Sequence, residues 1–284
     1  MLQSMKEFNR ILWAMFFEFF LLFQPFLPFS LAETHFFPDP NLDSAVRKHL
    51  FGSDPKEEDL RRLSTIKATS SGIVNLAGLE KCTALAALDL AGNQITDLSP
   101  LKNLTGLQTL TLSGNRIRDL TPLSGLTNLQ YLELSGNDIT DLSPISKLAA
   151  LNALYLSKNR ISNIAPVSGL VKLYSLYLDG NQISDIKPLS NLKNLSSLDL
   201  TGNKVSELSP VSTLTGLRYL LLNKNQIKDI NVLVSMAKKD SEGEKSFAPY
   251  LWLFLAGNPL NVTARTNQAT ELRNYGVRVQ LEEQ

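Results

Sequence analysis

Leu107-Gln-Thr-Leu110-Thr-Leu112-Ser-Gly-Asn115-Arg-Ile117-Arg-Asp119-Leu120-Thr-Pro122-Leu123-Ser-Gly-Leu126 is one copy of a pattern that fills most of this 284-residue chain. The pattern returns every 22 residues, and its asparagine shows the period most plainly. A fixed period of this length indicates stacked structural repeats, each burying its apolar side against its neighbours. The asparagines stand at Asn93, Asn115, Asn137, Asn159, Asn181, Asn203 and Asn225.

The first half of each copy predicts a strand. Leu110 and Leu112 alternate with Thr109 and Thr111, which is the period of a strand with one buried face and one solvated face. Stacked copies therefore predict a parallel sheet. The asparagine follows the strand, where its amide can bond backbone groups of neighbouring turns and form a ladder that satisfies buried polar groups. Ser71 takes its place in an earlier copy.

The second half of each copy predicts a short return segment rather than another strand. It carries the motif Asp-Leu-x-Pro-Leu, and proline fixes φ and lacks a backbone donor. These properties suit a 3₁₀-like turn on the far side of the sheet. The prolines are Pro100, Pro122, Pro144, Pro166, Pro188 and Pro210.

Both ends of the repeat array are predicted to be capped. Residues 33–62 form the N-terminal cap, in which Asp39-Pro-Asn41 begins one helix and Asp54-Pro-Lys-Glu57 resembles a capping box for a second. About nine repeats occupy residues 63–260, and an insertion near residues 236–246 predicts a solvated surface helix and loop. Residues 261–284 form the C-terminal cap, with a helix through Leu272 and a final strand over residues 277–281.

The first 32 residues differ in composition from the rest of the chain. Lys6 and Arg10 precede an apolar run, and the stretch closes on Ser30-Leu-Ala32 before Glu33. This order is typical of a secretory signal, although an uncleaved membrane anchor remains an alternative. The predicted localisation is therefore secreted, periplasmic or cell surface.

The net charge and the residue composition exclude several classes of function. The net charge of +1 and the absence of a Lys/Arg block argue against nucleic acid as a partner. Cys82 is the single cysteine and is predicted to be structural. The sequence shows no catalytic triad, no paired metal-ligand spacing and no phosphate-binding glycine loop, so it predicts a non-enzyme without cofactor or metal. The aspartate row at Asp97, Asp119, Asp141, Asp185 and Asp229 is predicted to cap local backbone rather than bind calcium.

The repeat motif, together with Phe37-Pro-Asp-Pro-Asn-Leu42 and Ala45-Val-Arg47, resembles the internalin-like leucine-rich repeat proteins of bacteria. The resemblance covers about residues 37–281. It implies an α/β solenoid: a right-handed horseshoe with a concave parallel sheet, a 3₁₀ or irregular convex side and a cap at each end. It also implies an exported protein that binds another protein on its concave face.

Strand alternation identifies the residues that face the concave side. They stand six, four and two positions before each asparagine. They include two clusters of aromatic residues, one near the centre of the sheet and one toward its C-terminal end. We predict partner binding by Tyr131, Glu133, Tyr155, Tyr177, Asp179, Asp199, Tyr219, Leu221, Trp252 and Phe254. A protein or peptide is the favoured ligand. The alternatives are carbohydrate or cell-wall binding and a purely structural surface scaffold.

Overall fold

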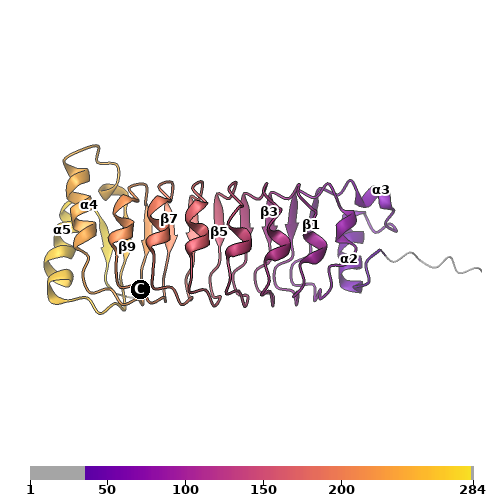
Figure 1. Cartoon of the computed structure of the whole chain (residues 1–284), viewed down its shortest axis with the longest axis horizontal. Coiled ribbons are helices and arrows are strands. Elements are labelled where there is room, and N and C mark those ends of the chain that lie inside the picture. The colour runs from indigo at the N-terminus through magenta and orange to yellow at the C-terminus, as the bar shows by residue number, and fades with distance from the viewer. Residues whose placement is uncertain (1–35, 283–284) are drawn as a thin grey trace, which may run out of the picture. The chain divides into compact units, whose positions relative to one another are not determined.

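The computed structural model describes residues 36–282, so the predicted leader at residues 1–32 lies outside the described part. Within residues 36–282 one sheet of ten parallel strands follows the order of the sequence, and Figure 1 shows the turns stacked side by side. The predicted fold class is confirmed. The strands are β1 (Thr65–Lys67), β2 (Ala87–Asp89), β3 (Thr109–Thr111), β4 (Tyr131–Glu133), β5 (Ala153–Tyr155), β6 (Ser175–Tyr177), β7 (Ser197–Asp199), β8 (Tyr219–Leu221), β9 (Trp252–Phe254) and β10 (Arg278–Gln280).

From β1 to β8 every strand is in register with its neighbours at the 22-residue period of the sequence. Leu132 at the centre of β4 pairs with Leu110 of β3 and with Leu154 of β5, and all three are fully buried. A fully buried leucine contributes about 1.5 to 3 kcal/mol through removal of its surface from water. The core is therefore a column of stacked leucines beneath the sheet, with the alternate side chains left on the concave face.

The predicted 3₁₀ returns are present, with a proline in the first turn of those that carry the motif. Leu123 and its equivalents point into the core from this side, so each return closes its own turn of the solenoid. The segments are η1 (Leu79–Lys81), η2 (Ser99–Leu101), η3 (Thr121–Leu123), η4 (Ser143–Ile145), η5 (Ala165–Gly169), η6 (Lys187–Asn191) and η7 (Ser209–Thr213).

The asparagine ladder has the predicted hydrogen bonds. The Asn159 amide donates to the carbonyls of Leu134 and Leu156, each at 3.0 Å, and its oxygen accepts from the Ile139 N–H at 3.0 Å. Its neighbours on either side repeat this set. Because Asn159 is 7% exposed, the amide replaces water for backbone groups of two successive turns.

The N-terminal cap is held to the repeats by one carboxylate. The Asp39 Oδ1 atom accepts from the N–H groups of Asn41 and Leu42, which caps helix α2 (Pro40–His49). Its Oδ2 atom accepts from Val74 and Asn75 of the first repeat at 2.8 and 3.0 Å. The N-cap was predicted, whereas the bond to the repeat was not.

The predicted capping box of the second helix is wrong. Helix α3 (Glu57–Leu60) has Lys56 at its N-cap position with no side-chain bond, and the Asp54 carboxylate accepts from Arg47 instead. Arg47 also pairs with Asp43 one turn back on α2, at 2.5 Å. A guanidinium within reach is a stronger donor than a backbone N–H, because charge-assisted bonds are about twice as strong as neutral ones.

The C-terminal end is built from α4 (Asn231–Ser241), η8 (Ala248–Tyr250), the π-helical segment η9 (Ala264–Gln268) and α5 (Ala269–Asn274). The predicted surface helix and loop are present at the insertion, with Lys238, Lys239 and residues 242–246 exposed, but Ala237, which was predicted to be solvated, is buried together with Met236. Asp240 at the end of α4 accepts from the N–H groups of residues 246–248 and so fixes the following loop. The helix therefore replaces a 3₁₀ return and packs on the core.

None of the helices within residues 36–282 combines the length and the apolar composition that crossing a bilayer requires.

Candidate functional site

The concave face carries a row of four side chains in direct register at its centre. Glu133 of β4 lies opposite Tyr155 of β5, Tyr155 lies opposite Tyr177 of β6, and Tyr177 lies opposite Asp199 of β7. Two tyrosines are thus bracketed by a carboxylate on each side. We call these four residues the central row. Since neighbouring strands are about 4.8 Å apart, the two carboxylate-bearing residues are separated by about 14 Å at their Cα atoms.

The tyrosine rings contact one another as the strand register predicts. The Tyr155 and Tyr177 rings are stacked with centroids 4.9 Å apart, and the Tyr131 ring approaches Tyr155 at 5.3 Å with an interplanar angle of 40°. Such aromatic pairs are worth about 0.5 to 1.5 kcal/mol beyond the area that they bury. All three rings remain half-exposed, so they form a continuous apolar platform that solvent still reaches.

The carboxylates around this platform are partly held by their own strand ends. Glu133 accepts from the Ser135 N–H at 2.7 Å, and Asp199 accepts from the Thr201 N–H at 2.8 Å. Each of these bonds uses one carboxylate oxygen. Asp179 lies two positions before its asparagine, on the same face, and is half-buried. Glu133 and Asp199 are therefore oriented by the backbone that follows their strands, through one oxygen of each carboxylate.

Burial shifts the proton affinities of this cluster. Desolvation raises the pKa of Asp199, with a contribution from the negative charge of Asp179 and opposition from the Thr201 hydrogen bonds. The pKa of Tyr155 is raised by desolvation, by Tyr177 and by Glu133, and the pKa of Tyr131 is shifted in the same direction. Ionised Asp199 is therefore less stable here than a fully solvated aspartate would be, and a nearby positive charge would offset that cost.

The C-terminal aromatic cluster is only partly available. Trp252 and Phe254 of β9 are half-exposed, with nearly parallel rings whose centroids are 6.4 Å apart. The Arg278 guanidinium of β10 lies 4.9 Å from the Trp252 ring centroid, so the terminal strand covers the outer side of this pair. Tyr219 of β8 is 47% exposed and lies opposite Trp252, and Leu221 lies opposite Phe254.

The convex aspartates cap local backbone, as predicted. Asp119 accepts from the Thr121 N–H at 2.8 Å, and hydrogen bonding by the Thr121 side chain and this backbone N–H lowers the pKa of its carboxyl. The same bond joins Asp141 to Ser143. Among residues 36–282 no group of three or more His, Cys, Asp or Glu side chains is arranged to hold a metal ion. Cys82 is buried, and desolvation raises the pKa of its thiol to about 12.

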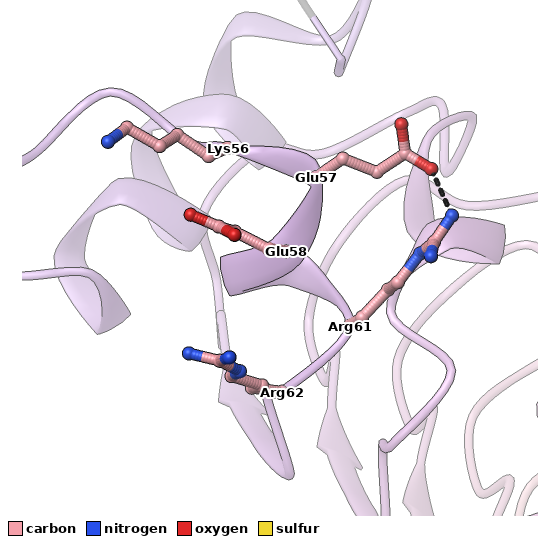
Figure 2. Close-up of a pocket in the computed structure, with 5 residues that line it drawn as sticks. All are labelled: Lys56, Glu57, Glu58, Arg61 and Arg62. Carbon is pink, nitrogen blue, oxygen red and sulfur yellow. Dashed lines mark hydrogen bonds and ion pairs between the residues drawn. The ribbon is translucent and has the colours of Figure 1, made fainter.

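Two surface hollows were not predicted from the sequence. One of about 650 Å³ lies at α3, and Figure 2 shows its charged lining, with the Glu57–Arg61 ion pair on one side and Lys56, Glu58 and Arg62 on the other. Both members of that pair are exposed, and such surface pairs contribute little to stability or recognition.

The other hollow, of about 670 Å³, lies where the chain enters β5 and β6. It is lined by Lys172, Tyr174 and Lys193, and Tyr174 is 58% exposed. Tyr174 could have been found in the sequence, because it is an aromatic residue directly before a strand, at the edge of the concave face.

Comparisons with known proteins agree with this geometry. The family model for leucine-rich repeats in two copies matches residues 83–125, 105–147, 127–169, 150–191 and 171–213. The solved structure of internalin C2 from Listeria monocytogenes is 31% identical, with a TM-score of 0.66, over 87% of this chain and 94% of that one. No curated protein sequence gives a significant match.

Two more distant structures share the fold. A leucine-rich repeat protein from Leptospira interrogans is 23% identical with a TM-score of 0.58, over 73% of this chain and 57% of that one. The ectodomain of the plant receptor kinase GASSHO1/SCHENGEN3 from Arabidopsis thaliana is 29% identical with a TM-score of 0.57. That match covers 66% of this chain and 23% of the receptor chain, which was solved in complex with Casparian strip integrity factor 2. Proteins of this fold typically act as non-enzymatic scaffolds for binding other proteins.

Proposed function

Because this chain belongs to the internalin-like leucine-rich repeat proteins, we propose that it is an exported interaction module that binds a partner protein or peptide on its concave face without catalysis. The observation that carries the proposal is the half-exposed stack of Tyr131, Tyr155 and Tyr177 on that face. Aromatic anchors with polar neighbours are the residues that protein interfaces concentrate at their centres. An open sheet offers them to a macromolecule rather than enclosing a small substrate.

The second aromatic group extends the proposed footprint toward the C-terminal end. Tyr219, Leu221, Trp252 and Phe254 lie on β8 and β9, and β8 is one strand beyond Asp199. A protein partner spans both groups, since a stable interface buries about 800 Å² on each side. A short glycan covers one group only. Replacing Trp252 should therefore weaken the binding of a protein partner and leave the binding of a glycan at the central tyrosines unchanged.

We expect a triple variant of Tyr131, Tyr155 and Tyr177 to alanine to lose its partner. Each tyrosine at an interface centre is worth about 2 kcal/mol on truncation, so retention should fall by well over tenfold. The measurement uses the immobilised full chain as bait against extracts of the organism's envelope and surroundings, with the retained proteins identified by mass spectrometry.

The matched control is Phe51 to alanine together with Tyr250 to alanine, which removes two exposed aromatic side chains that lie on neither the central row nor the hollow at β5 and β6. This control should retain the same proteins as the wild type. If wild type and the triple variant retain identical material, the central tyrosines do not bind a protein, and their role is to stabilise the sheet by about 0.2 to 1 kcal/mol per cross-strand pair.

Export is proposed from the sequence of the first 32 residues. Their basic, apolar and small-residue order supports cleavage after Ala32. The mature chain would then begin at Glu33, which intact-mass measurement on protein from the native host can establish. A mass that includes residues 1–32 would contradict cleavage and favour an anchored form.

A further inference from the structure

The charged side chains that face outward from the inner strands of the sheet have one sign. Along the three outward rows from β2 to β9, every charged residue is acidic: Asp89, Glu133, Asp179 and Asp199. The basic residues of these rows, Lys67 and Arg278, lie on the terminal strands β1 and β10. Three of the four carboxylates adjoin the tyrosine stack, either within the central row or, for Asp179, two residues beyond Tyr177.

We propose that the central row binds a cationic segment of the partner, with an arginine or lysine side chain lying on the Tyr155–Tyr177 platform and paired with Glu133 or Asp199. This inference rests on the proposed function and adds the chemical nature of the partner. Cations are attracted to the faces of aromatic rings, and a guanidinium can also make paired hydrogen bonds to a carboxylate. Arginine therefore fits the site better than lysine.

The spacing of the row sets the spacing of the basic residues. The Cα atoms of Glu133 and Asp199 are about 14 Å apart, because three strand intervals separate β4 from β7. An extended segment advances about 3.3 Å per residue, so two basic residues four positions apart match the two carboxylates. The segment would cross the strands of the sheet at a steep angle.

Two arginines near the row are already paired with a carboxylate. Arg118 and Arg160 follow their asparagines and lie beyond the strand ends, where both pair with Asp138 at 3.5 and 2.5 Å. Asp199 also supports the inference, because its partial burial penalises the ionised carboxylate, which a cation would stabilise. A carboxylate kept at a cost to the free protein is expected where a ligand relieves that cost.

The test uses fluorescein-labelled peptides of glycine and serine that carry two arginines four positions apart, with fluorescence anisotropy of the full chain in low salt. Companion peptides carry two citrullines, which are neutral and similar in shape, or two glutamates. We expect the arginine peptide to bind at least tenfold more tightly than the citrulline peptide, and the glutamate peptide not to bind.

Two full-chain variants with the same change in charge locate the binding. Glu133→Gln with Asp199→Asn should weaken the arginine peptide at least tenfold. Glu242→Gln with Glu244→Gln, in the exposed loop after α4, should change it by less than about twofold. The central variant should keep its thermal midpoint, because Asp199→Asn removes a half-buried charge and leaves an amide oxygen that can still accept from the Thr201 N–H.

Three results would overturn the inference: no arginine-peptide binding up to about 1 mM, equal binding of arginine and citrulline peptides, or equal weakening by the two charge variants. The proposed function would survive any of these if the tyrosine variant still lost a protein partner. If a neutral oligosaccharide binds the wild type while the arginine peptide does not, a glycan occupies the platform. If the wild-type chain binds neither the arginine peptide nor any protein from the extracts, the proposed function itself is contradicted.

Discussion

Replacing Asn159 by alanine is expected to lower the free energy of unfolding by about 3 kcal/mol. The substitution leaves the Ile139 N–H without its acceptor and removes one of the two amide donors to each of the Leu134 and Leu156 carbonyls, which keep the bonds from Asn137 and Asn181. The Ile139 N–H lies inside the stack, where a donor left without a partner costs about 1 to 3 kcal/mol, and each lost bond to a carbonyl adds about 0.5 to 1.5 kcal/mol. Urea unfolding followed by circular dichroism measures the loss, and an unchanged slope would show that the native state is still compact.

The position of Asn159 in the array gives the same experiment a second readout. Each repeat contacts mainly its neighbours, so a weakened central turn can uncouple the two halves of the solenoid. Uncoupling would appear as two unfolding transitions. Asn128→Ala is the matched control, because its amide makes one exposed bond to the Thr105 carbonyl at 2.9 Å. The control should change stability by less than about 0.5 kcal/mol, and an equal loss in both variants would contradict a buried ladder.

Replacing Asp39 by asparagine is expected to release the N-terminal cap at a cost of about 2 kcal/mol. Asparagine is a good N-cap, so the bonds to Asn41 and Leu42 can persist through its one oxygen. Its NH₂ group cannot accept from Val74 and Asn75, which now bond the second oxygen of Asp39. Those N–H groups should then exchange with solvent faster, as hydrogen exchange can measure.

The cost should depend on pH with a defined sign. Burial acts to raise the pKa of Asp39, but the four backbone N–H groups outweigh it and hold the pKa below its ordinary value of 3.8. A depressed pKa means that the ionised carboxylate stabilises the fold above pH 3.8 and that this contribution is lost as the pH falls through the folded-state pKa. The difference between wild type and Asp39→Asn should therefore shrink at low pH.

Asp97→Asn serves as the control, because Asp97 makes one exposed bond, to the Ser99 N–H at 2.8 Å. It should change neither stability nor its pH dependence measurably. If Asp39→Asn behaves like this control, then the carboxylate does not hold the cap to the first repeat.

Much of the candidate site follows from the repeat period alone. Once Asn137, Asn159 and Asn181 are aligned, strand alternation places Tyr131, Tyr155 and Tyr177 on one face, and the strand spacing places their rings in contact. Their partner-binding role stays a prediction. The period could not show that Arg278 covers Trp252, because Arg278 lies outside the regular repeats and reaches the ring only through the fold of the C-terminal cap.

Gln268 shows the same limit. Its side-chain oxygen accepts from the Ile230 N–H at 3.0 Å, and its amide donates to Asp229 at 2.9 Å, so it satisfies polar groups of the last regular turn. Nothing in the residues around Gln268 distinguishes it from any other helical glutamine. Its partners lie far away in sequence, at separations of 38 and 39 positions.

The repeated motif was sufficient to specify the strand period, the ladder, the convex turns and the composition of the concave face, because a stacked repeat has the same surroundings in every turn. The two ends depended on contacts that form only in the folded chain. There Asp54 pairs with Arg47 rather than capping α3, Ala237 is buried, and Asp39 ties α2 to the first repeat. At an end the neighbouring turn is missing, so each residue bonds whichever group the cap brings within reach, and no periodic pattern encodes that choice.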